Sequence, residues 1–150
     1  MFTKRLFAGW GDMDFNAHMK NTAYLDKSAD VRMMYFAENG FPMQEFARRR
    51  LGPVVMRDEV EYFREVTLLQ PIDVSLAVAG LSADGSRMVL RNEIRREDGK
   101  ACVKVTSTVG WLDLDARKLV APPEELLAAL RNLDRTEDFR ELPSSLRGGA

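Results

Sequence analysis

The second half of the chain alternates between apolar and polar residues with the period of two that is typical of β-strands. Four such runs are separated by Gln70-Pro71 and by two Asp-Gly pairs, which favour tight hairpin turns. Strands joined by tight turns are antiparallel neighbours. We therefore expect long antiparallel strands at residues 54–66, 72–81, 87–97 and 101–113.

The first half carries the strongest helical pattern. Apolar residues recur near helical spacing from residue 21 to residue 39, and Gly40 followed by Pro42 supplies the expected end of the helix. A few charged residues interrupt this pattern, and we expect them on a less buried face of the helix: Asp26, Asp30 and Arg32.

One face of the predicted sheet is apolar and needs a cover, because Ile72, Val74, Leu76 and Val78 all point the same way. Residues 3–10 add a first strand with Leu6, Ala8 and Trp10 on one side. The helix at 21–39 is long enough to cover five strands, whereas a second helix at 124–130 is short. The pattern thus predicts an α+β fold, a five-stranded antiparallel sheet wrapped around a long central helix.

The composition fits a single globular domain. A chain of 150 residues with 45% hydrophobic and 30% charged residues is long enough to bury roughly two-thirds of its unfolded surface around one core. Residues 134–150 are rich in charge and end in Gly-Gly-Ala, which suggests a frayed or partner-bound tail. We expect one domain at residues 1–133 and a C-terminal tail at 134–150.

The charge balance and the cysteine count exclude several classes of protein. A formal net charge of -1 gives no general attraction to nucleic acid or to an anionic membrane, and no apolar run approaches the roughly 18 residues of a membrane span. The single cysteine excludes an intrachain disulfide and a multi-cysteine metal cluster. The N-terminal residues lack the apolar run of a signal peptide, so we expect a cytoplasmic protein without bound metal or cofactor.

The candidate chemistry lies just before the long helix. Asp12, Asp14 and the only histidine, His18, precede Asn21, where the helix is expected to begin. Unpaired amides at a helix N-terminus stabilise negative charge on a carbonyl oxygen, and a nearby carboxylate acts as a nucleophile or as a base for water. Asp14 lies nearer the helix than Asp12. The alternative is that both aspartates cap the helix and that His18 is a structural hydrogen-bonding group.

This stretch is identified by a family resemblance. Residues 11–24 resemble the signature Asp-x-Asp-x-x-Gly-His-x-Asn-Asn-x-x-Tyr of the 4-hydroxybenzoyl-CoA thioesterase family of hotdog-fold acyl-CoA thioesterases, and residues 52–62 resemble that family's second strand. The resemblance implies that Asp14 is the nucleophile or general base of thioester hydrolysis. It also implies that a backbone amide at or beside Asn21 is the oxyanion donor and that His18 orients the acyl group or the loop.

The resemblance further implies an acyl-CoA or acyl carrier protein thioester as substrate and a homodimer or homotetramer, joined edge to edge, that completes the pocket. Ala17 replaces the glycine of the signature and Lys20 replaces its first asparagine, so substrate choice is expected to differ. The CoA phosphates need cations, for which Arg57, Arg87, Arg91 and the triplet 48–50 are candidates, although the triplet also suits a solvated helix end. The expected substrate-binding residues are Phe15, Asn16, Met19, Tyr24, Arg57, Glu59 and Arg87.

Two other functions remain open. A hotdog enoyl-CoA hydratase or dehydratase would bind a similar thioester, but those enzymes carry a catalytic Asp and His five positions apart, whereas Asp14 and His18 are four apart. A non-catalytic hotdog protein that binds acyl thioesters would have no need of a carboxylate beside a helix N-terminus. Both alternatives are weaker than thioester hydrolysis.

Overall fold

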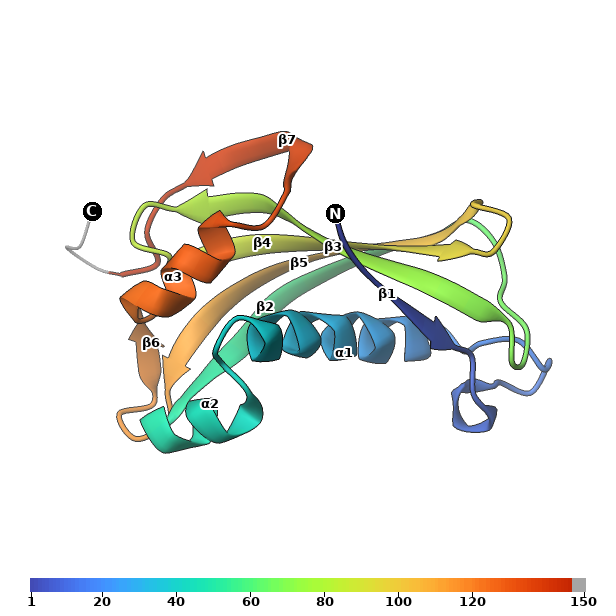
Figure 1. Ribbon diagram of the computed structural model, residues 1–150, viewed down its shortest axis with the longest axis horizontal. Coiled ribbons are helices and arrows are strands. Elements are labelled where there is room, and N and C mark those ends of the chain that lie inside the picture. The colour runs from blue at the N-terminus through green and yellow to red at the C-terminus, as the bar shows by residue number, and fades with distance from the viewer. Residues whose placement is uncertain (147–150) are drawn as a thin grey trace.

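The computed structural model describes residues 1–146 and shows a curved sheet that lies over one long helix (Figure 1). The long helix, α1, spans Ala23–Glu38, and two shorter helices, α2 and α3, flank one end of the sheet. The remaining elements are β1 Phe2–Phe7, a 3-10 turn Trp10–Asp12, α2 Met43–Arg49, β2 Leu51–Tyr62, β3 Pro71–Ser82, β4 Arg87–Arg96, β5 Ala101–Asp113, β6 Lys118–Val120, α3 Glu124–Arg131 and β7 Arg135–Leu142.

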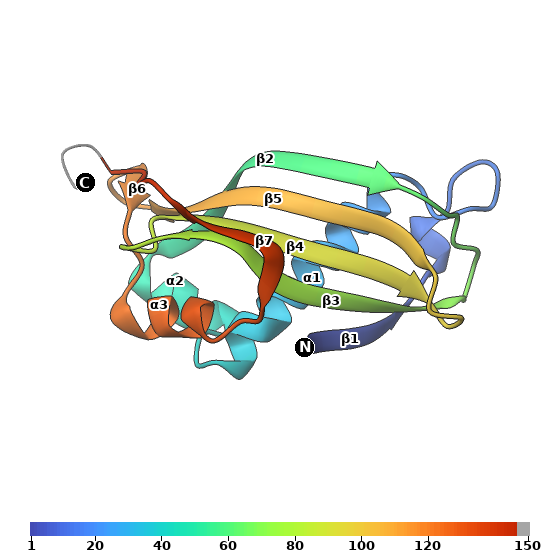
Figure 2. The ribbon, with the colours of Figure 1, turned by 90° about the horizontal axis from the view of Figure 1, so that it is seen from above.

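Within residues 1–146 the sheet has seven strands, where five were expected. Its main path runs in the order β1-β3-β4-β5-β2 and is antiparallel throughout (Figure 2). The short β6 adds an antiparallel partner to β5, and β7 pairs with β3 in parallel. The five predicted strands are confirmed, and the two additional strands were missed because one is three residues long and the other is mostly charged.

The helix α1 packs on the apolar face of the sheet, as the hydrophobic pattern predicts. Val31, Tyr35 and Phe36 are buried on the helix, and the ring of Phe36 lies 5.6 Å from that of Trp111 on β5 in an edge-to-face arrangement. Such a pair contributes about 0.5–1.5 kcal/mol beyond the burial of its area. The Tyr35 hydroxyl donates a hydrogen bond to the Ala129 carbonyl at 2.6 Å and so ties α1 to α3.

Arg32 is buried, contrary to the expectation from the sequence, whereas Asp26 and Asp30 are exposed as expected. Only 8% of Arg32 is exposed, and burial lowers the pKa of its guanidinium although the charge of Asp58 acts in the opposite direction. Its Nε donates to Asn92 at 2.9 Å and its Nη2 donates to Ser107 at 2.8 Å. The charge is tolerated inside the fold because these polar side chains of β4 and β5 accept its hydrogen bonds.

The C-terminal segment is a strand and not a frayed tail over residues 135–142. β1 pairs with the first half of β3 and β7 takes over the same edge from Val78 onward, so the two strands share the edge that β3 would otherwise expose. Beyond β7, Ser144 donates a hydrogen bond to Asp84, and the Ser145 amide donates to Ser86. The last four residues of the predicted tail, 147–150, lie outside the described residues.

The boundaries of β1 and β2 also differ from the prediction. The first strand ends at Phe7, and Trp10 lies in the following 3-10 turn with 83% of its surface exposed, not on the face shared by Leu6 and Ala8. β2 begins at Leu51 and includes Pro53. Proline has no N–H to donate to a neighbouring strand, and it is tolerated here because β2 lies at the edge of the sheet.

Candidate active site

The loop before α1 is folded around the carboxylate of Asp14. Oδ1 of Asp14 accepts hydrogen bonds from the backbone amides of Asn16 at 2.8 Å and His18 at 3.1 Å. The Asp14 amide donates to the His18 carbonyl at 2.8 Å, which closes a tight turn over these residues. One carboxylate oxygen is therefore fixed by the backbone, while Oδ2 has no hydrogen-bond partner within residues 1–146 and is available to a ligand.

The backbone conformation of Ala17 explains why the family signature has glycine at this position. Its φ of 62° lies in the left-handed region, which costs a residue with a side chain about 1–2 kcal/mol and costs glycine little. The turn keeps its conformation in this chain because the surrounding hydrogen bonds of Asp14 and His18 impose it.

Some backbone amides at the start of α1 have no hydrogen-bond acceptor within residues 1–146, whereas others are bonded to nearby carbonyls. The Ala23 amide donates to the Lys20 carbonyl, and the Leu25 amide donates to the Thr22 carbonyl. For the amides of Asn21, Thr22 and Tyr24, the described part of the chain provides no acceptor. These donors carry the partial positive charge of the helix N-terminus.

A single cleft of about 350 Å³ brings the carboxylate and the helix start together. Five of the residues singled out from the sequence line it: Asp14, His18, Met19, Asn21 and Tyr24. The other wall was not foreseen and consists of Tyr62, the last residue of β2, and the three residues that follow it, Phe63, Arg64 and Glu65. Their signal in the sequence was weak because residues 54–66 read as one continuous strand, whereas the chain leaves the strand after Tyr62.

Two tyrosines define the interior of this cleft. Tyr24 is buried, which raises the pKa of its phenol to about 12, and its ring packs edge to face against that of Tyr62 at 5.7 Å. The Tyr62 hydroxyl donates a hydrogen bond to the Asn21 carbonyl at 3.0 Å. Because a trans peptide is planar, fixing this carbonyl also fixes the direction of the Thr22 N–H.

Asp12 and His18 have identifiable structural partners. Burial alone would raise the pKa of Asp12, but hydrogen bonds from the Gly9 amide at 2.8 Å and the Lys27 ammonium at 3.0 Å lower it overall. His18 Nε2 lies 3.1 Å from the Glu65 carboxylate across the cleft. Asp12 therefore holds the loop against the helix, whereas His18 and Glu65 face the cleft itself.

Several predicted substrate-binding residues lie elsewhere in this chain. Phe15 is fully exposed beside a neighbouring hollow, and Asn16 is exposed on the turn. Arg57 and Glu59 form an ion pair with each other at 2.6 Å on the face of the sheet away from α1, and Arg87 donates to Ser145. Their roles in binding remain predictions, and none of them lines the Asp14 cleft of the same chain.

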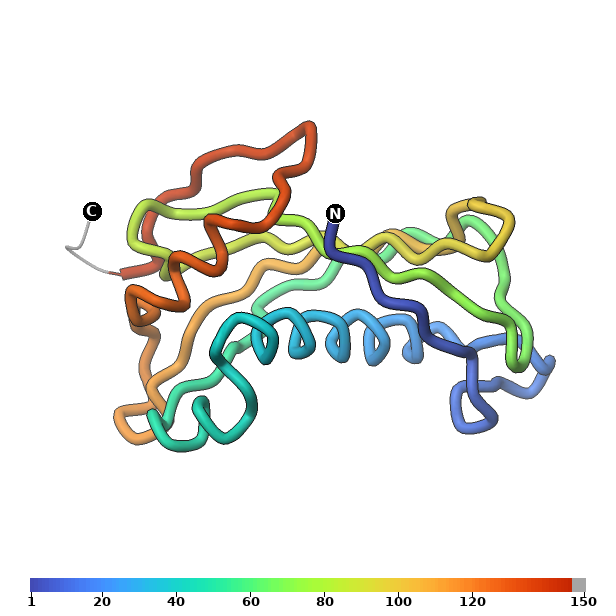
Figure 3. The backbone as a smooth tube through the Cα atoms, in the orientation of Figure 1, coloured from blue at the N-terminus to red at the C-terminus, as the bar shows by residue number. Residues whose placement is uncertain are grey.

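The basic triplet is a helix end. Arg48 and Arg49 both pair with Glu45, and Arg50 pairs with Asp115. The triplet lies at the C-terminus of α2, and the backbone trace in Figure 3 places α2 and the Asp14 loop at opposite ends of α1. Its role as a phosphate site therefore stays a prediction, and it lies far from Asp14 within the same chain.

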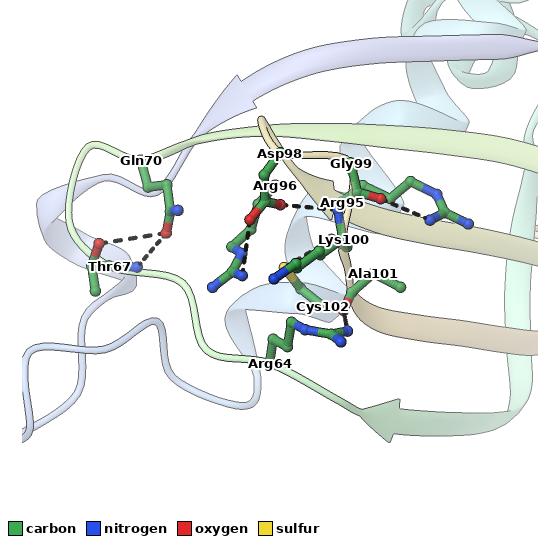
Figure 4. Close-up of polar contacts among 10 residues, drawn as sticks. All are labelled: Arg64, Thr67, Gln70, Arg95, Arg96, Asp98, Gly99, Lys100, Ala101 and Cys102. Atoms are coloured by element: carbon green, nitrogen blue, oxygen red, sulfur yellow. Dashed lines mark hydrogen bonds and ion pairs between the residues drawn. The ribbon is translucent and has the colours of Figure 1, made fainter.

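No group of three or more potential metal-ligating side chains occurs within residues 1–146. Across the same residues, no helix is long and apolar enough to cross a membrane. Cys102 is buried on β5, where its thiol donates to the Lys100 carbonyl at 3.7 Å (Figure 4), and burial raises its pKa.

Comparison with known proteins identifies the family. The model of the Thioesterase-like superfamily matches residues 8–130, so the chain belongs to that superfamily. Its fold is the hotdog-like thioesterase fold, in which an antiparallel sheet is accompanied by few helices. Among curated proteins, none matches this chain.

Solved structures share this fold at low sequence identity. A 1,4-dihydroxy-2-naphthoyl-CoA thioesterase from Synechocystis superposes with a TM-score of 0.78 at 15% identity, over 88% of this chain and 96% of that one. A gentisyl-coenzyme A thioesterase gives 0.76 at 12% identity, over 85% and 98%. A protein from Staphylococcus aureus in complex with CoA gives 0.77 at 20% identity, over 88% and 85%.

Proposed function

We propose that the protein is an acyl-CoA thioesterase of the 4-hydroxybenzoyl-CoA thioesterase type, which hydrolyses an acyl thioester to the free acid and CoA. The observation that carries this proposal is the single cleft that contains both the Asp14 carboxylate and the start of α1, where backbone amides have no acceptor within the described residues. Membership of the Thioesterase-like superfamily and the likeness to CoA thioesterases support it.

The proposed reaction uses a carboxylate and backbone donors in the same step. The thioester carbonyl oxygen accepts a hydrogen bond from an amide at Asn21 or Thr22, which stabilises the negative charge that develops there. Asp14, or a water molecule from which it removes a proton, attacks the carbonyl carbon. The carbon–sulfur bond breaks and the thiolate leaves with the electron pair. If water attacks, the free acid forms directly; if Asp14 attacks, the acyl group is held as a mixed anhydride that one water molecule then hydrolyses to the free acid and the Asp14 carboxylate.

The fixed geometry of Asp14 supports this role over simple helix capping. Oδ1 is occupied by the amides of its own turn, so Asp14 does not cap α1, whose first residue is Ala23. Oδ2 remains for the reaction. His18, held at 3.1 Å from Glu65, is placed to orient the loop or the acyl group.

A homodimer or homotetramer is part of the proposal. β2 is an edge strand that pairs only with β5 within residues 1–146, and its Val55 and Met56 are exposed apolar side chains. An unpaired edge of this kind is a template for pairing with a second copy. Such a copy would bring residues such as Arg57 or Glu59 toward a cleft from which they are distant in their own chain.

The assay that tests the proposal compares two reactions of the thioester. The purified protein is given a panel of saturated aliphatic and aromatic acyl-CoAs and, separately, an enoyl-CoA. Release of the free thiol and loss of the double bond are followed in parallel. Thiol release without hydration is expected. Hydration of the enoyl-CoA would favour the hydratase alternative, and binding of CoA esters without turnover would favour the non-catalytic alternative.

A further inference from the structure

Asp14 borders two hollows of different chemical character. One is the cleft already described, which it shares with Tyr62, Phe63 and Arg64. The other has a volume of about 380 Å³ and is lined, apart from Asp14, by Trp10, Met13, Phe15, Ala17 and Leu68. A thioester also has two unlike arms that meet at its carbonyl group, a hydrocarbon acyl arm and a polar thiol arm.

The second hollow is apolar and unusually exposed. Its aromatic side chains are almost entirely in solvent, since Trp10 is 83% exposed and Phe15 is 103% exposed. Leu68 adds a third apolar side chain that is 39% exposed. An exposed apolar concavity of this kind is typical of a ligand-binding surface.

The first cleft continues into a basic region on its far side. Tyr62, Phe63 and Arg64 also line a hollow of about 640 Å³ that contains Arg95 and Lys104, so the two spaces share one wall. Arg95, near the end of β4, donates to the Gly99 carbonyl, and Arg64 donates to the Ala101 carbonyl at the start of β5, so both side chains lie at the hairpin that connects these strands (Figure 4). Tyr62 and Phe63 are each about half exposed at this wall and present aromatic rings to solvent.

The charges of this hollow are incompletely neutralised. Arg95 is paired with Glu93 at 2.8 Å, whereas Arg64 donates only to the Ala101 carbonyl and forms no ion pair within residues 1–146. Lys104 faces Glu61 and Glu93 on the neighbouring strands but forms no ion pair with either of them. Two cations are therefore available to phosphate oxygens.

We propose that the substrate lies across Asp14 with its acyl arm in the hollow of Trp10, Phe15 and Leu68, and with its CoA arm over Tyr62 and Phe63 so that Arg64 and Lys104 bind the phosphates. This inference rests on the proposed thioesterase function and specifies the orientation of its substrate. The half-exposed rings of Tyr62 and Phe63 lie between Asp14 and these cations, where the pantetheine part of the CoA arm would pass. The two arms then depend on different residues, and each dependence is measurable separately.

The test uses three substrates with one thioester group: butanoyl-CoA, octanoyl-CoA and octanoyl-pantetheine, which lacks the phosphates and the nucleotide. In the unsubstituted protein, we expect kcat/KM to rise about fourfold for each methylene that contacts the hollow, which gives a preference for octanoyl-CoA over butanoyl-CoA. Phe15→Ala is expected to remove most of this preference. Lys104→Gln and Arg64→Gln are each expected to raise KM for octanoyl-CoA about tenfold. Lys104→Gln, which lies outside the Asp14 cleft, is expected to leave KM for octanoyl-pantetheine unchanged. Lys118→Gln, at the opposite end of the sheet on β6, is the control.

Three results would overturn the orientation. The pattern could be reversed, with Phe15→Ala changing the preference for octanoyl-CoA over octanoyl-pantetheine and Lys104→Gln changing the preference for octanoyl-CoA over butanoyl-CoA. That result would assign the two arms the other way round. A loss of oligomer in Phe15→Ala with unchanged chain-length preference would make the apolar hollow a contact with a second copy. In a parallel assay with octanoyl-acyl carrier protein, an effect of Lys104→Gln and Arg64→Gln on that substrate and not on octanoyl-CoA would assign the basic hollow to the carrier protein.

Failure of the proposed function is distinguishable from failure of the orientation. Binding of free CoA and of free pantetheine is measured by calorimetry with the unsubstituted protein and with Lys104→Gln. The phosphate site would be supported if CoA bound more tightly than pantetheine and if Lys104→Gln reduced the affinity for CoA about tenfold. This result would hold even if no thioester were hydrolysed. Equal binding of the two ligands would contradict the phosphate site whatever the activity.

Discussion

The Tyr62 hydroxyl holds the Asn21 carbonyl at 3.0 Å, so a side chain from the end of β2 fixes a peptide at the start of α1. The N–H of that peptide belongs to Thr22, and it points away from the carbonyl because the peptide is trans. Tyr62 thus sets the direction of a candidate oxyanion donor without touching the reacting atoms. It is a positioning residue in the proposed mechanism.

Replacement of Tyr62 by phenylalanine tests this relationship. Tyr62→Phe keeps the ring that packs against Tyr24 but removes the hydrogen bond to Asn21. We expect kcat for thioester hydrolysis to fall about tenfold with little change in KM, because a misdirected donor stabilises the transition state less well. Tyr35→Phe is the contrast, since it is expected to cost about 1 kcal/mol of unfolding free energy and to leave kcat unchanged. Equal kcat values for Tyr62→Phe and the unsubstituted enzyme would exclude the positioning role.

Ala17→Gly tests the strain in the Asp14 turn. Glycine relieves the left-handed conformation at φ 62° but adds freedom to the unfolded chain, and the two effects nearly cancel. The unfolding free energy is therefore expected to stay the same or to rise by less than about 1 kcal/mol. Ala29→Gly, at an exposed position within α1, is expected to lose about 1 kcal/mol in the same urea titration. A loss of similar size in both variants would show that Ala17 is not strained.

Arg32→Met tests the buried polar network beneath the sheet. The substitution leaves the acceptors of Asn92 and Ser107 without their donor inside the fold, and we expect it to lower the unfolding free energy by about 2–4 kcal/mol. Arg48→Met, on the exposed end of α2, is the matched control and is expected to cost less than about 1 kcal/mol, because it removes only an exposed ion pair with Glu45. Comparable unfolding midpoints for the two variants would show that the network contributes nothing to stability.

Asp84 is expected to make stability depend on pH in the acid range. Burial opposes ionisation of this carboxyl, but hydrogen bonds from Ser144, Ser86 and Ser82 outweigh it and hold its pKa well below the usual value. Because the pKa is lower in the folded state, Asp84 stabilises the fold above about pH 4, the unfolded value, and this contribution disappears as pH falls toward the folded value. Asp84→Asn should flatten the fall in unfolding free energy below pH 5, whereas an unchanged slope would mean that other carboxyl groups cause it.

Much of the fold could be predicted because its signals are local. The alternation in β3 and β5, the Asp-Gly turns and the helical spacing around Phe36 are properties of neighbouring residues. β7 escaped prediction because its sequence is mostly charged and it forms by completing the edge of β3, a contact over more than fifty residues of sequence. Arg32 was misplaced for a similar reason, since the polar partners that permit its burial come from distant strands.

Half of the candidate site could be predicted in the same way. Asp14, His18, Asn21 and Tyr24 lie within one short stretch, so their proximity follows from the turn and the first turn of α1. The opposite wall, with Tyr62 and Glu65, depends on where β2 ends in space, and no local pattern encodes that position.

The central claim is that the carboxylate of Asp14 performs the chemistry. The most direct measurement is kcat for hydrolysis of the best acyl-CoA by Asp14→Asn, compared with Asp30→Asn, which changes an exposed aspartate on α1 in the same way. Circular dichroism and the oligomeric mass of both variants control for the fold. We expect kcat of Asp14→Asn to fall at least 100-fold while Asp30→Asn stays within twofold of the unsubstituted enzyme. Full turnover by a correctly folded Asp14→Asn would contradict the mechanism.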